Sequence, residues 1–417
     1  MKEIAVYADW IGLPETSEMG ILRSQQLRGE EVFSFEYAES WLKSGFAQEV
    51  DPDLKLYEGP QYINDDKPNF GLFLDSSPDR WGRMLMERRE AILSRKTGQA
   101  KKRLTESDYL LGVNDETRMG ALRFKLDREG DFLSKQAGAD VPPFTSIREL
   151  EQASLRIEDD DFFKDEHAQK WLMMLMAPGS SLGGARPKAS VKDPEGSLWI
   201  AKFPSKKDEK DSGAWELIVN QMAKELGIHV AVGQAEVYSQ KRHTFLTKRF
   251  DRTKDNKRIH FASAMSLLGY KDGYNHKEGG SYLEIVELIE QYGGDANRDI
   301  RELWRRIVFS VAISNTDDHL RNHGFLFAND GWHLSPAFDI NPTEKGTGLS
   351  LNISEDDNSL DFDLCMDVTD YFRWEEDEAK GFIDKTKDIV SQWKKRASKM
   401  GVPNSELAMM ETSFNRA

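Results

Sequence analysis

Cysteine is nearly absent from this 417-residue chain: Cys365 stands alone, so no disulfide can form within the chain. We interpret Cys365 as a small buried residue, because no histidine or basic cluster flanks it to make it a nucleophile. Long apolar runs are also lacking, since the longest, Trp171 to Ala177, is far shorter than the ~20 residues of a membrane helix. The segment Met1 to Tyr7 predicts a strand and not a signal peptide. We therefore expect a soluble cytoplasmic protein with no membrane partner.

Positive charge is in deficit, with 57 Lys and Arg against 72 Asp and Glu and a formal net charge of −15. This balance argues against a surface that coats DNA, which would have to neutralise many phosphates. It leaves room for a local basic patch, or for a partner that contacts DNA in its place. A hydrophobic content of 39% excludes global disorder, and the length suffices for two or three domains.

The order of predicted elements indicates an α+β protein of several parts. Residues 130–165 are polar and contain Pro142-Pro143 and an acidic run, so we interpret them as a linker or a solvated face. Periodicity predicts strands at 4–7, 32–37, 189–192, 198–203, 234–238 and 244–250, and a hairpin around Asn329-Asp330-Gly331. It predicts helices at 79–96, 213–226, 282–292, 297–315 and 379–400. Three domains are expected: 1–130, 131–252 and 253–417.

The segment richest in chemistry follows the long helix predicted at 297–315. Asp317 and Asn322 have the D-x-x-x-x-N spacing of a kinase catalytic loop, in which the Asp accepts the hydroxyl proton and the Asn binds Mg²⁺. Asp339, just past the predicted hairpin, stands where kinases place the carboxylate that binds Mg²⁺ across the β- and γ-phosphates. Either motif alone is equally well explained by helix caps and turns. Their order along the chain favours a phosphoryl-transfer site.

A zinc site is the competing interpretation of the same segment. His319 and His323 lie one helical turn apart, which would suit a zinc pair on a helix. Gly324 argues against a continuing helix, however, and no third ligand follows. We therefore expect His319 to pack the catalytic loop and count it with the nucleotide site.

Two charged residues upstream would complete a kinase site. Lys202 interrupts an apolar strand, and Glu216 follows in the first turns of the next helix. A strand lysine held by a helix glutamate positions the α- and β-phosphates in kinases. The alternative is an edge lysine and an unrelated surface glutamate.

The glycine loop from Gly179 to Lys188 is not a Walker A motif, because no Lys-Ser/Thr pair follows its spaced glycines. Its position before the hairpin that ends in Lys202 would let the backbone N–H groups of Gly183, Gly184 and Ala185 cover phosphates. Ser180 and Ser181 lie in this loop, near the expected γ-phosphate, and both are candidates for self-phosphorylation.

The strand that leads from the second part to the third supplies a candidate hinge. Its residues Lys248, Arg249 and Phe250 would present backbone groups to the adenine edge of ATP. Arg249 and Asp251 are open to a second interpretation, as surface charges at the junction.

Together these motifs resemble the HipA-type toxin kinases over nearly the whole chain. The matching segments are Phe-Gly-Leu-Phe-Leu-Asp-Ser-Ser-Pro-Asp at 70–79, Arg-Met-Gly-Ala-Leu at 118–122, Ser-Leu-Gly-Gly-Ala-Arg-Pro-Lys at 181–188, Thr-Lys-Arg-Phe-Asp-Arg at 247–252, Asn-Thr-Asp-Asp-His-x-x-Asn at 315–322 and Phe-Asp-Ile at 338–340. One departure is Arg186-Pro187, where the best-known members carry Gln-Glu.

The resemblance implies a two-lobed kinase-like fold, with a mixed α/β N-terminal lobe and an all-helical C-terminal lobe. It implies ATP and Mg²⁺ as cofactors and serine/threonine protein phosphorylation, with Asp317 as base, Asn322 and Asp339 as metal ligands and Lys202 as phosphate lysine. Ser181 occupies the position of the family's self-phosphorylated serine. The implied partners are a HipB-like helix-turn-helix antitoxin, operator DNA mainly through that antitoxin, and a protein substrate, which in some members is an aminoacyl-tRNA synthetase.

Two other functions remain open from the sequence. A small-molecule kinase of aminoglycoside or lipid type would use the same carboxylates. A non-catalytic module that binds a DNA-binding regulator is of another class, although the presence of Lys202, Asp317, Asn322 and Asp339 together argues against a dead kinase.

Overall fold

The chain divides into two compact units, neither of which is one continuous stretch. The computed structural model describes residues 1–63, 67–133, 141–159, 161–165, 167–176, 184–239 and 241–416. The first unit contains residues 1–206 and 251–271, and the second contains residues 207–250 and 272–417. This division differs from the three consecutive domains expected from the sequence, because the segment 251–271 returns to the first unit after the second has begun. The two units are defined by compactness alone, so the division into three domains by function remains a prediction.

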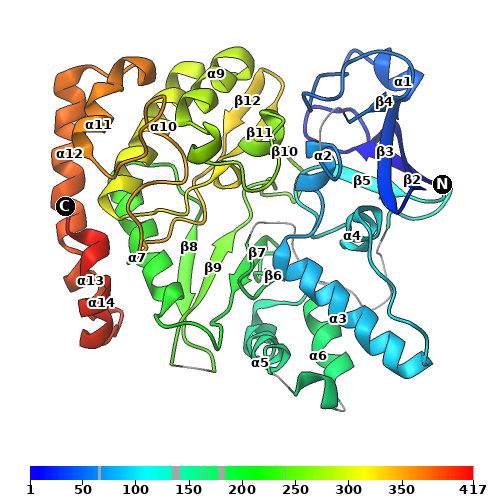
Figure 1. The fold of residues 1–417 in the computed structure, drawn as a ribbon, viewed down its shortest axis with the longest axis horizontal. Coiled ribbons are helices and arrows are strands. Elements are labelled where there is room, and N and C mark those ends of the chain that lie inside the picture. Colours follow the sequence, from blue (N-terminus) through cyan, green and yellow to red (C-terminus); the bar gives the residue numbers. More distant parts are fainter. Residues whose placement is uncertain are drawn as a thin grey trace. The chain divides into compact units, whose positions relative to one another are not determined.

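The first unit is built on an antiparallel sheet in the order β4-β3-β2-β1-β5 (Figure 1). The alternation typical of strands buries Phe33, Phe35 and Tyr37 on one face of β3. The ring of Phe35 lies 5.6 Å from that of Phe73 on the short helix α2, which extends the core away from the sheet. The strands of this sheet are β1 (Lys2–Ala8), β2 (Ser17–Leu27), β3 (Glu30–Tyr37), β4 (Gln61–Tyr62) and β5 (Leu122–Lys125).

Helices and a separate hairpin complete the first unit. Its helices are α1 (Glu39–Leu42), α2 (Gly71–Asp75), α3 (Arg80–Thr97), α4 (Glu106–Gly112), α5 (Ile147–Ile157), α6 (Ala168–Met176) and α8 (Ala264–Leu267). Its other strands are the antiparallel pair β6 (Lys188–Lys192) and β7 (Leu198–Lys202), and β10 (Phe261–Ser263). The linker predicted at 130–165 is wrong where α5 lies. Ile147, Leu150, Ala153 and Ile157 form a buried face on that helix, which packs against α6 (Figure 1).

The second unit is mostly helical and contains two antiparallel hairpins. Its helices are α7 (Ser212–Glu225), α9 (Tyr282–Tyr292), α10 (Ala296–Ala312), α11 (Phe362–Asp367), α12 (Glu376–Ser391), α13 (Trp393–Lys399) and α14 (Asn404–Phe414). The hairpins are β8 (Gly233–Glu236) with β9 (Thr244–Lys248), and β11 (Gly324–Ala328) with β12 (Gly331–Leu334). The second hairpin confirms the turn predicted at Asn329-Asp330-Gly331, and it makes this part of the chain mostly, not entirely, helical.

Buried aromatic rings form the centre of the second unit. Trp304 of α10 is fully buried, and its ring lies 4.7 Å from that of Trp374. The ring of Trp393 stacks on that of Phe414 at 4.7 Å. Cys365 is fully buried as expected, and burial raises the pKa of its thiol, which makes it unreactive.

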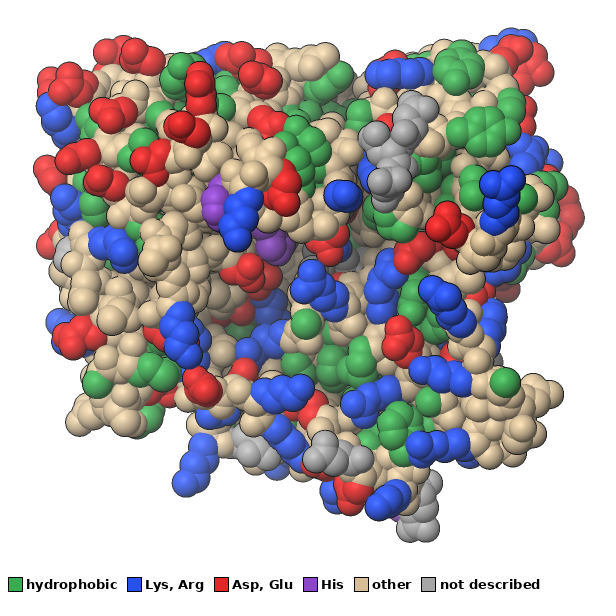
Figure 2. Space-filling model, in the orientation of Figure 1, with side chains coloured by type: hydrophobic (Ala, Val, Ile, Leu, Met, Phe, Trp, Pro, Cys, Tyr) green, Lys and Arg blue, Asp and Glu red, His purple; other side chains and the backbone are tan. Residues whose placement is uncertain are grey.

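Charged side chains are unevenly distributed over each unit. Figure 2 shows Lys and Arg side chains gathered over α3, α5 and α6, and Asp and Glu side chains over α9, α11 and α12. Within the described part of the chain, no helix has the length and apolar character needed to cross a bilayer.

Asp51 gives the first unit a pH-dependent stability. Its buried carboxylate accepts hydrogen bonds from the backbone N–H groups of Leu72 and Asp53, at 2.7 and 2.9 Å, and so caps α2 from a distance. Burial raises its pKa from 3.8 to about 6, so the folded chain binds this proton more tightly than the unfolded chain. We expect the free energy of unfolding to fall as the pH rises from 4 to 6, by roughly 3 kcal/mol in total from this group.

Urea denaturation at several pH values measures this slope. Asp51→Asn cannot titrate, so the difference between the slopes of parent and variant isolates the contribution of Asp51. Equal slopes in the two proteins would contradict the prediction.

Candidate functional site

The segment after α10 folds into a loop that brings Asp317 and Asn322 together. The side-chain Nδ2 of Asn322 donates to the backbone oxygen of Asp317 at 2.9 Å, and its backbone N–H donates to the oxygen of His319 at 2.8 Å. The loop ends in a short 3₁₀ turn, Leu320–Asn322, directly before β11. Asp317 is exposed, whereas Asn322 is buried. The loop therefore exposes the carboxylate of Asp317 to solvent, while the buried amide of Asn322 holds the backbone of Asp317 in place.

Asp318, which the sequence analysis did not single out, anchors this loop to the core. Its buried Oδ2 accepts hydrogen bonds from the hydroxyls of Tyr282 and Ser310, at 2.7 and 3.2 Å, and its Oδ1 lies 3.1 Å from Nε2 of His323. Burial alone would raise the pKa of Asp318, but the charge of His323 and the Tyr282 hydroxyl hold that pKa below its usual value of 3.8. Asp318 is thus a buried carboxylate that remains charged.

Asp339 lies beyond the β11–β12 hairpin in a backbone conformation that is rare for a non-glycine residue. Its φ is +57°, in the left-handed region, which marks a position constrained by its surroundings. Nδ2 of Asn341 donates to its Oδ1 at 3.1 Å, and the backbone N–H of Asn341 donates to Oδ1 of Asn315 at 3.3 Å. Two hydrogen bonds through Asn341 therefore join Asp339 to Asn315, at the beginning of the loop that contains Asp317 and Asn322.

The loop of Asp317 and Asn322 and the segment of Asp339 also share a small cavity. Its volume is about 20 Å³, enough for one water molecule, and Asp318, Asn322 and Phe338 are among its lining residues. The ring of Phe338 lies 5.4 Å from that of Phe250, the last residue of the predicted hinge. The backbone N–H of Ala231 donates to the backbone oxygen of Ala337 at 3.0 Å. The backbone N–H of Ala337 in turn donates to the backbone oxygen of His229 at 2.8 Å. The end of the hinge and the segment of Asp339 thus belong to one part of the second unit.

The donor set of this loop fits a magnesium ion. Because Nδ2 of Asn322 is engaged by Asp317, its Oδ1 is the amide atom left to act as a ligand. The Asp339 carboxylate would add the second hard oxygen ligand that Mg²⁺ prefers. Among the described residues, no group of three or more His, Cys, Asp or Glu is arranged to hold a metal. A magnesium ion bound through one Asn, one Asp and phosphates does not need such a group.

Of the remaining predicted residues of the second unit, Glu216 and Arg249 are buried, whereas Lys248, Phe250 and His319 are half-buried. Glu216 lies on α7 and is 5% exposed, and the backbone N–H of Lys248 donates to the oxygen of Val232 at 2.8 Å. Arg249 is 3% exposed and Asp251, in the first unit, is fully buried. The interpretation of Arg249 and Asp251 as surface charges is therefore wrong. Their neighbours cover them although the sequence around them is strongly charged.

Lys202 and the described end of the glycine loop belong to the first unit. Lys202 is the last residue of β7, and Gly184 and Ala185 precede β6. Ser180, Ser181 and Gly183 lie outside the described residues. Because Lys202 and Glu216 fall in different units, their pairing remains a prediction.

A buried ion pair at the end of the glycine loop was not predicted from the sequence. Nζ of Lys188 lies 2.8 Å from Oδ2 of Asp79, and their side chains are 2% and 1% exposed. The two residues are 109 positions apart, so no local pattern connects them. The only signal was their presence in two of the motifs shared with the kinase family.

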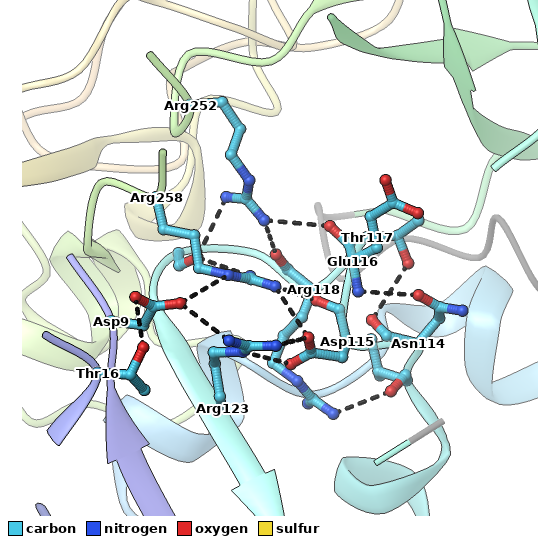
Figure 3. A network of polar contacts seen from close by, with 12 residues as sticks. Asp9, Thr16, Asn114, Asp115, Glu116, Thr117, Arg118, Arg123, Arg252 and Arg258 are labelled. Atoms are coloured by element: carbon cyan, nitrogen blue, oxygen red, sulfur yellow. Dashed lines mark hydrogen bonds and ion pairs between the residues drawn. The ribbon is translucent and has the colours of Figure 1, made fainter. Parts of the chain in front are cut away.

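Figure 3 shows how two of those motifs are joined within the first unit. The backbone N–H of Gly120 donates to Oδ2 of Asp251 at 2.8 Å, and Arg252 donates to the backbone oxygens of Gly120 and Arg118 at 3.1 and 2.8 Å. Around them Arg123 and Arg258 pair with Asp115, at 2.6 and 3.3 Å. The network anchors Asp251 and Arg252, the two residues that follow the predicted hinge.

Position 120, at the centre of this network, admits only glycine without strain. Its φ is +70°, and a Cβ at this position would lie 3.1 Å from the backbone nitrogen of Phe261. A side chain here would be strained and crowded, so glycine is needed at position 120 for the close approach to Phe261.

Comparison with known proteins agrees with these features. The family model described as "HipA-like C-terminal domain" matches residues 180–398, slightly more than half of the chain. A Haemophilus influenzae protein named "Putative kinase" is 28% identical over 180 residues, 39% of this chain and 52% of that protein. "Putative kinase Y4mE" of Sinorhizobium fredii is 26% identical over 158 residues, 36% of each chain. The chain thus spans about half of the first relative's length and about a third of the second's.

Among solved structures, the fold resembles that of HipA from Shewanella oneidensis, solved as a toxin–antitoxin complex with HipB and operator DNA. The TM-score is 0.64 at 16% sequence identity, and the match covers 99% of this chain and 95% of that one. At this identity the similarity concerns the fold, which is α+β and kinase-like. Together with the family match, this places the chain in the HipA-like family.

Proposed function

We propose that the chain is an ATP-dependent serine/threonine protein kinase and the toxin of a toxin–antitoxin pair. The observation that carries this proposal is the catalytic loop, in which Asn322 holds the backbone of an exposed Asp317 above the buried Asp318. A helix cap or a plain turn would not require that arrangement. Asp339, held by Asn341 in a strained conformation, supports the same proposal.

In the proposed reaction a substrate hydroxyl attacks the γ-phosphorus of ATP. The Asp317 carboxylate accepts the hydroxyl proton, the new P–O bond forms, and the bond to the β–γ bridging oxygen breaks to release ADP. Asn322 and Asp339 would hold Mg²⁺, which neutralises charge on the phosphates when bound. Lys202, held by Glu216, would bind the α- and β-phosphates, and the backbone of Lys248 to Phe250 would bind adenine.

The proposed partners follow from the family and from the neighbour of known structure. That neighbour was solved with HipB and operator DNA, so we propose a HipB-like helix-turn-helix antitoxin that carries this chain to its operator. The net charge of −15 is consistent with DNA contact mainly through the antitoxin. The proposed substrate is a cytoplasmic protein, of which an aminoacyl-tRNA synthetase is one candidate, and Ser181 or Ser180 would be the site of self-phosphorylation.

Transfer of ³²P from labelled ATP to the chain itself, with and without Mg²⁺, tests the proposal. We expect metal-dependent labelling, and we expect Asp339→Ala to weaken binding of Mg²⁺ and ATP by about tenfold or more, since it removes a charged ligand. Asp384→Asn, on the exposed face of α12, serves as the control and should behave as the parent does. If the affinity for ATP did not depend on Mg²⁺ and were the same in the parent and in Asp339→Ala, the assignment of Asp339 as a metal ligand would be wrong.

A further inference from the structure

The carboxylate of Asp79 has two functions in the first unit. Its Oδ1 accepts the backbone N–H of Gly82 at 2.8 Å and so caps the beginning of α3. Its Oδ2 accepts from the ammonium of Lys188 at 2.8 Å, and both side chains are almost completely buried. Removing one residue of such a pair takes a close counter-charge from the other, which stays buried. The pair therefore ties the beginning of α3 firmly to the end of the glycine loop.

Trp81 holds the same part of the glycine loop through its backbone and its ring. Its backbone N–H donates to the oxygen of Gly184 at 3.4 Å, and its Nε1 donates to the oxygen of Lys188 at 3.0 Å. Gly184 has a φ of +93°, and a Cβ at this position would lie 3.4 Å from Nζ of Lys188. The buried ammonium thus lies directly under the loop backbone. Residues 184–188 are fixed on α3 at both ends.

The register of the β6–β7 hairpin brings Lys188 opposite Lys202. The two are direct partners, and the adjacent hydrogen bond from the N–H of Phe203 to the oxygen of Pro187, at 2.8 Å, makes theirs a non-hydrogen-bonded pair. In such pairs the side chains lie on the same face and close together. Two like charges so placed repel each other. Asp79 supplies the negative charge that offsets this repulsion on the Lys188 side.

We propose that Asp79 and Lys188 are positioning residues for the nucleotide phosphates. The pair fixes the end of the glycine loop and offsets the positive charge of the lysine that faces Lys202, so that Lys202 can be directed toward phosphate. Lys188 is too deeply buried to contact the nucleotide and acts through the loop and through Lys202. This inference deepens the proposed kinase function and rests on it.

A double-mutant cycle separates positioning from simple structural support. The variants are Asp79→Asn, Lys188→Met and both together, and Asn at 79 keeps an oxygen to cap α3. The double variant Asp53→Asn/Lys67→Met is the matched control, since Lys67 and Asp53 form another shielded ion pair of the first unit. For each protein we would measure the free energy of unfolding, the Kd of the ATP analogue AMP-PNP with Mg²⁺, and KM and kcat for ATP.

We expect each single variant to be destabilised, and the double variant to regain much of that loss because no unpaired charge remains. The double variant should still bind AMP-PNP about tenfold more weakly, with a raised KM and a nearly unchanged kcat, because the loop is no longer positioned. The control double variant should bind as the parent does. A double variant that binds AMP-PNP as tightly as the parent overturns this inference and leaves the kinase proposal standing. A parent chain that binds no AMP-PNP overturns both.

Discussion

Asp317→Asn is expected to reduce ³²P transfer by about 10³-fold, because it removes the group that accepts the hydroxyl proton. The side chain is exposed and it is the backbone oxygen of Asp317 that Asn322 holds, so the amide should leave the loop intact. The free energy of unfolding and the Kd of Mg²⁺–ATP should therefore remain those of the parent. The loss should fall on kcat and hardly on KM.

The control for this experiment is again Asp384→Asn, which makes the same chemical change on an exposed part of α12. If Asp317→Asn transferred phosphate at the parental rate, the assignment of Asp317 as the base would fail. A variant that lost nucleotide binding as well would indicate that Asp317 acts as a metal ligand.

Asp318→Ala should have the largest effect on stability, about 3–5 kcal/mol, because it removes the buried carboxylate that accepts from Tyr282 and Ser310 and pairs with His323. Tyr282→Phe, which removes one of these donors and keeps the ring, should cost about 1 kcal/mol. Phosphoryl transfer by the folded fraction should also fall, since the adjacent Asp317 loses its support. Urea denaturation followed by the ³²P assay measures both effects.

The pH dependence gives an independent test of Asp318. Its pKa is lowered in the folded chain, so its contribution to stability is complete above the unfolded value of 3.8 and is lost as the pH falls through the folded value. The stability difference between parent and Asp318→Ala should therefore shrink at strongly acidic pH. A difference that stays constant down to pH 2 would show that Asp318 is not a charged anchor.

Elements with local signals could be predicted closely from the sequence. The helix predicted at 282–292 is α9, because Ser281 and Glu284 form a capping box at its beginning and Gly293 follows its end. The helix predicted at 379–400 is instead two helices, α12 and α13, interrupted at Gln392. No glycine or proline marks that break. It coincides with the burial of Trp393 against Phe414, a contact that local sequence does not reveal.

Strand β2 was missed because of its composition. Its sequence, SEMGILRSQQL, is largely polar, yet residues 17–24 of it pair with β1 and residues 20–27 pair with β3. Hydrogen bonding on both edges stabilises a strand whose residues show little intrinsic preference for one.

The residues of the candidate site also divide into those with a local sequence signal and those without one. Asp317 and Asn322 could be predicted because their spacing lies within one loop, whereas Asp318 is held by Tyr282, 36 residues earlier. The pair of Asp79 and Lys188 spans still more sequence, and a single sequence carries no signal that links such positions.

The discontinuous first unit has a consequence for synthesis on the ribosome. Its network of Asp251 and Arg252 with Gly120 cannot form until the chain beyond residue 250 has emerged. By then residues 207–250, which belong to the second unit, have already left the ribosome without the partners that residues 272–417 will supply. Vectorial folding, one domain after another, is therefore unavailable to this chain. A pause in translation between residues 207 and 271 would therefore prolong the time that residues 207–250 spend without their partners in the second unit.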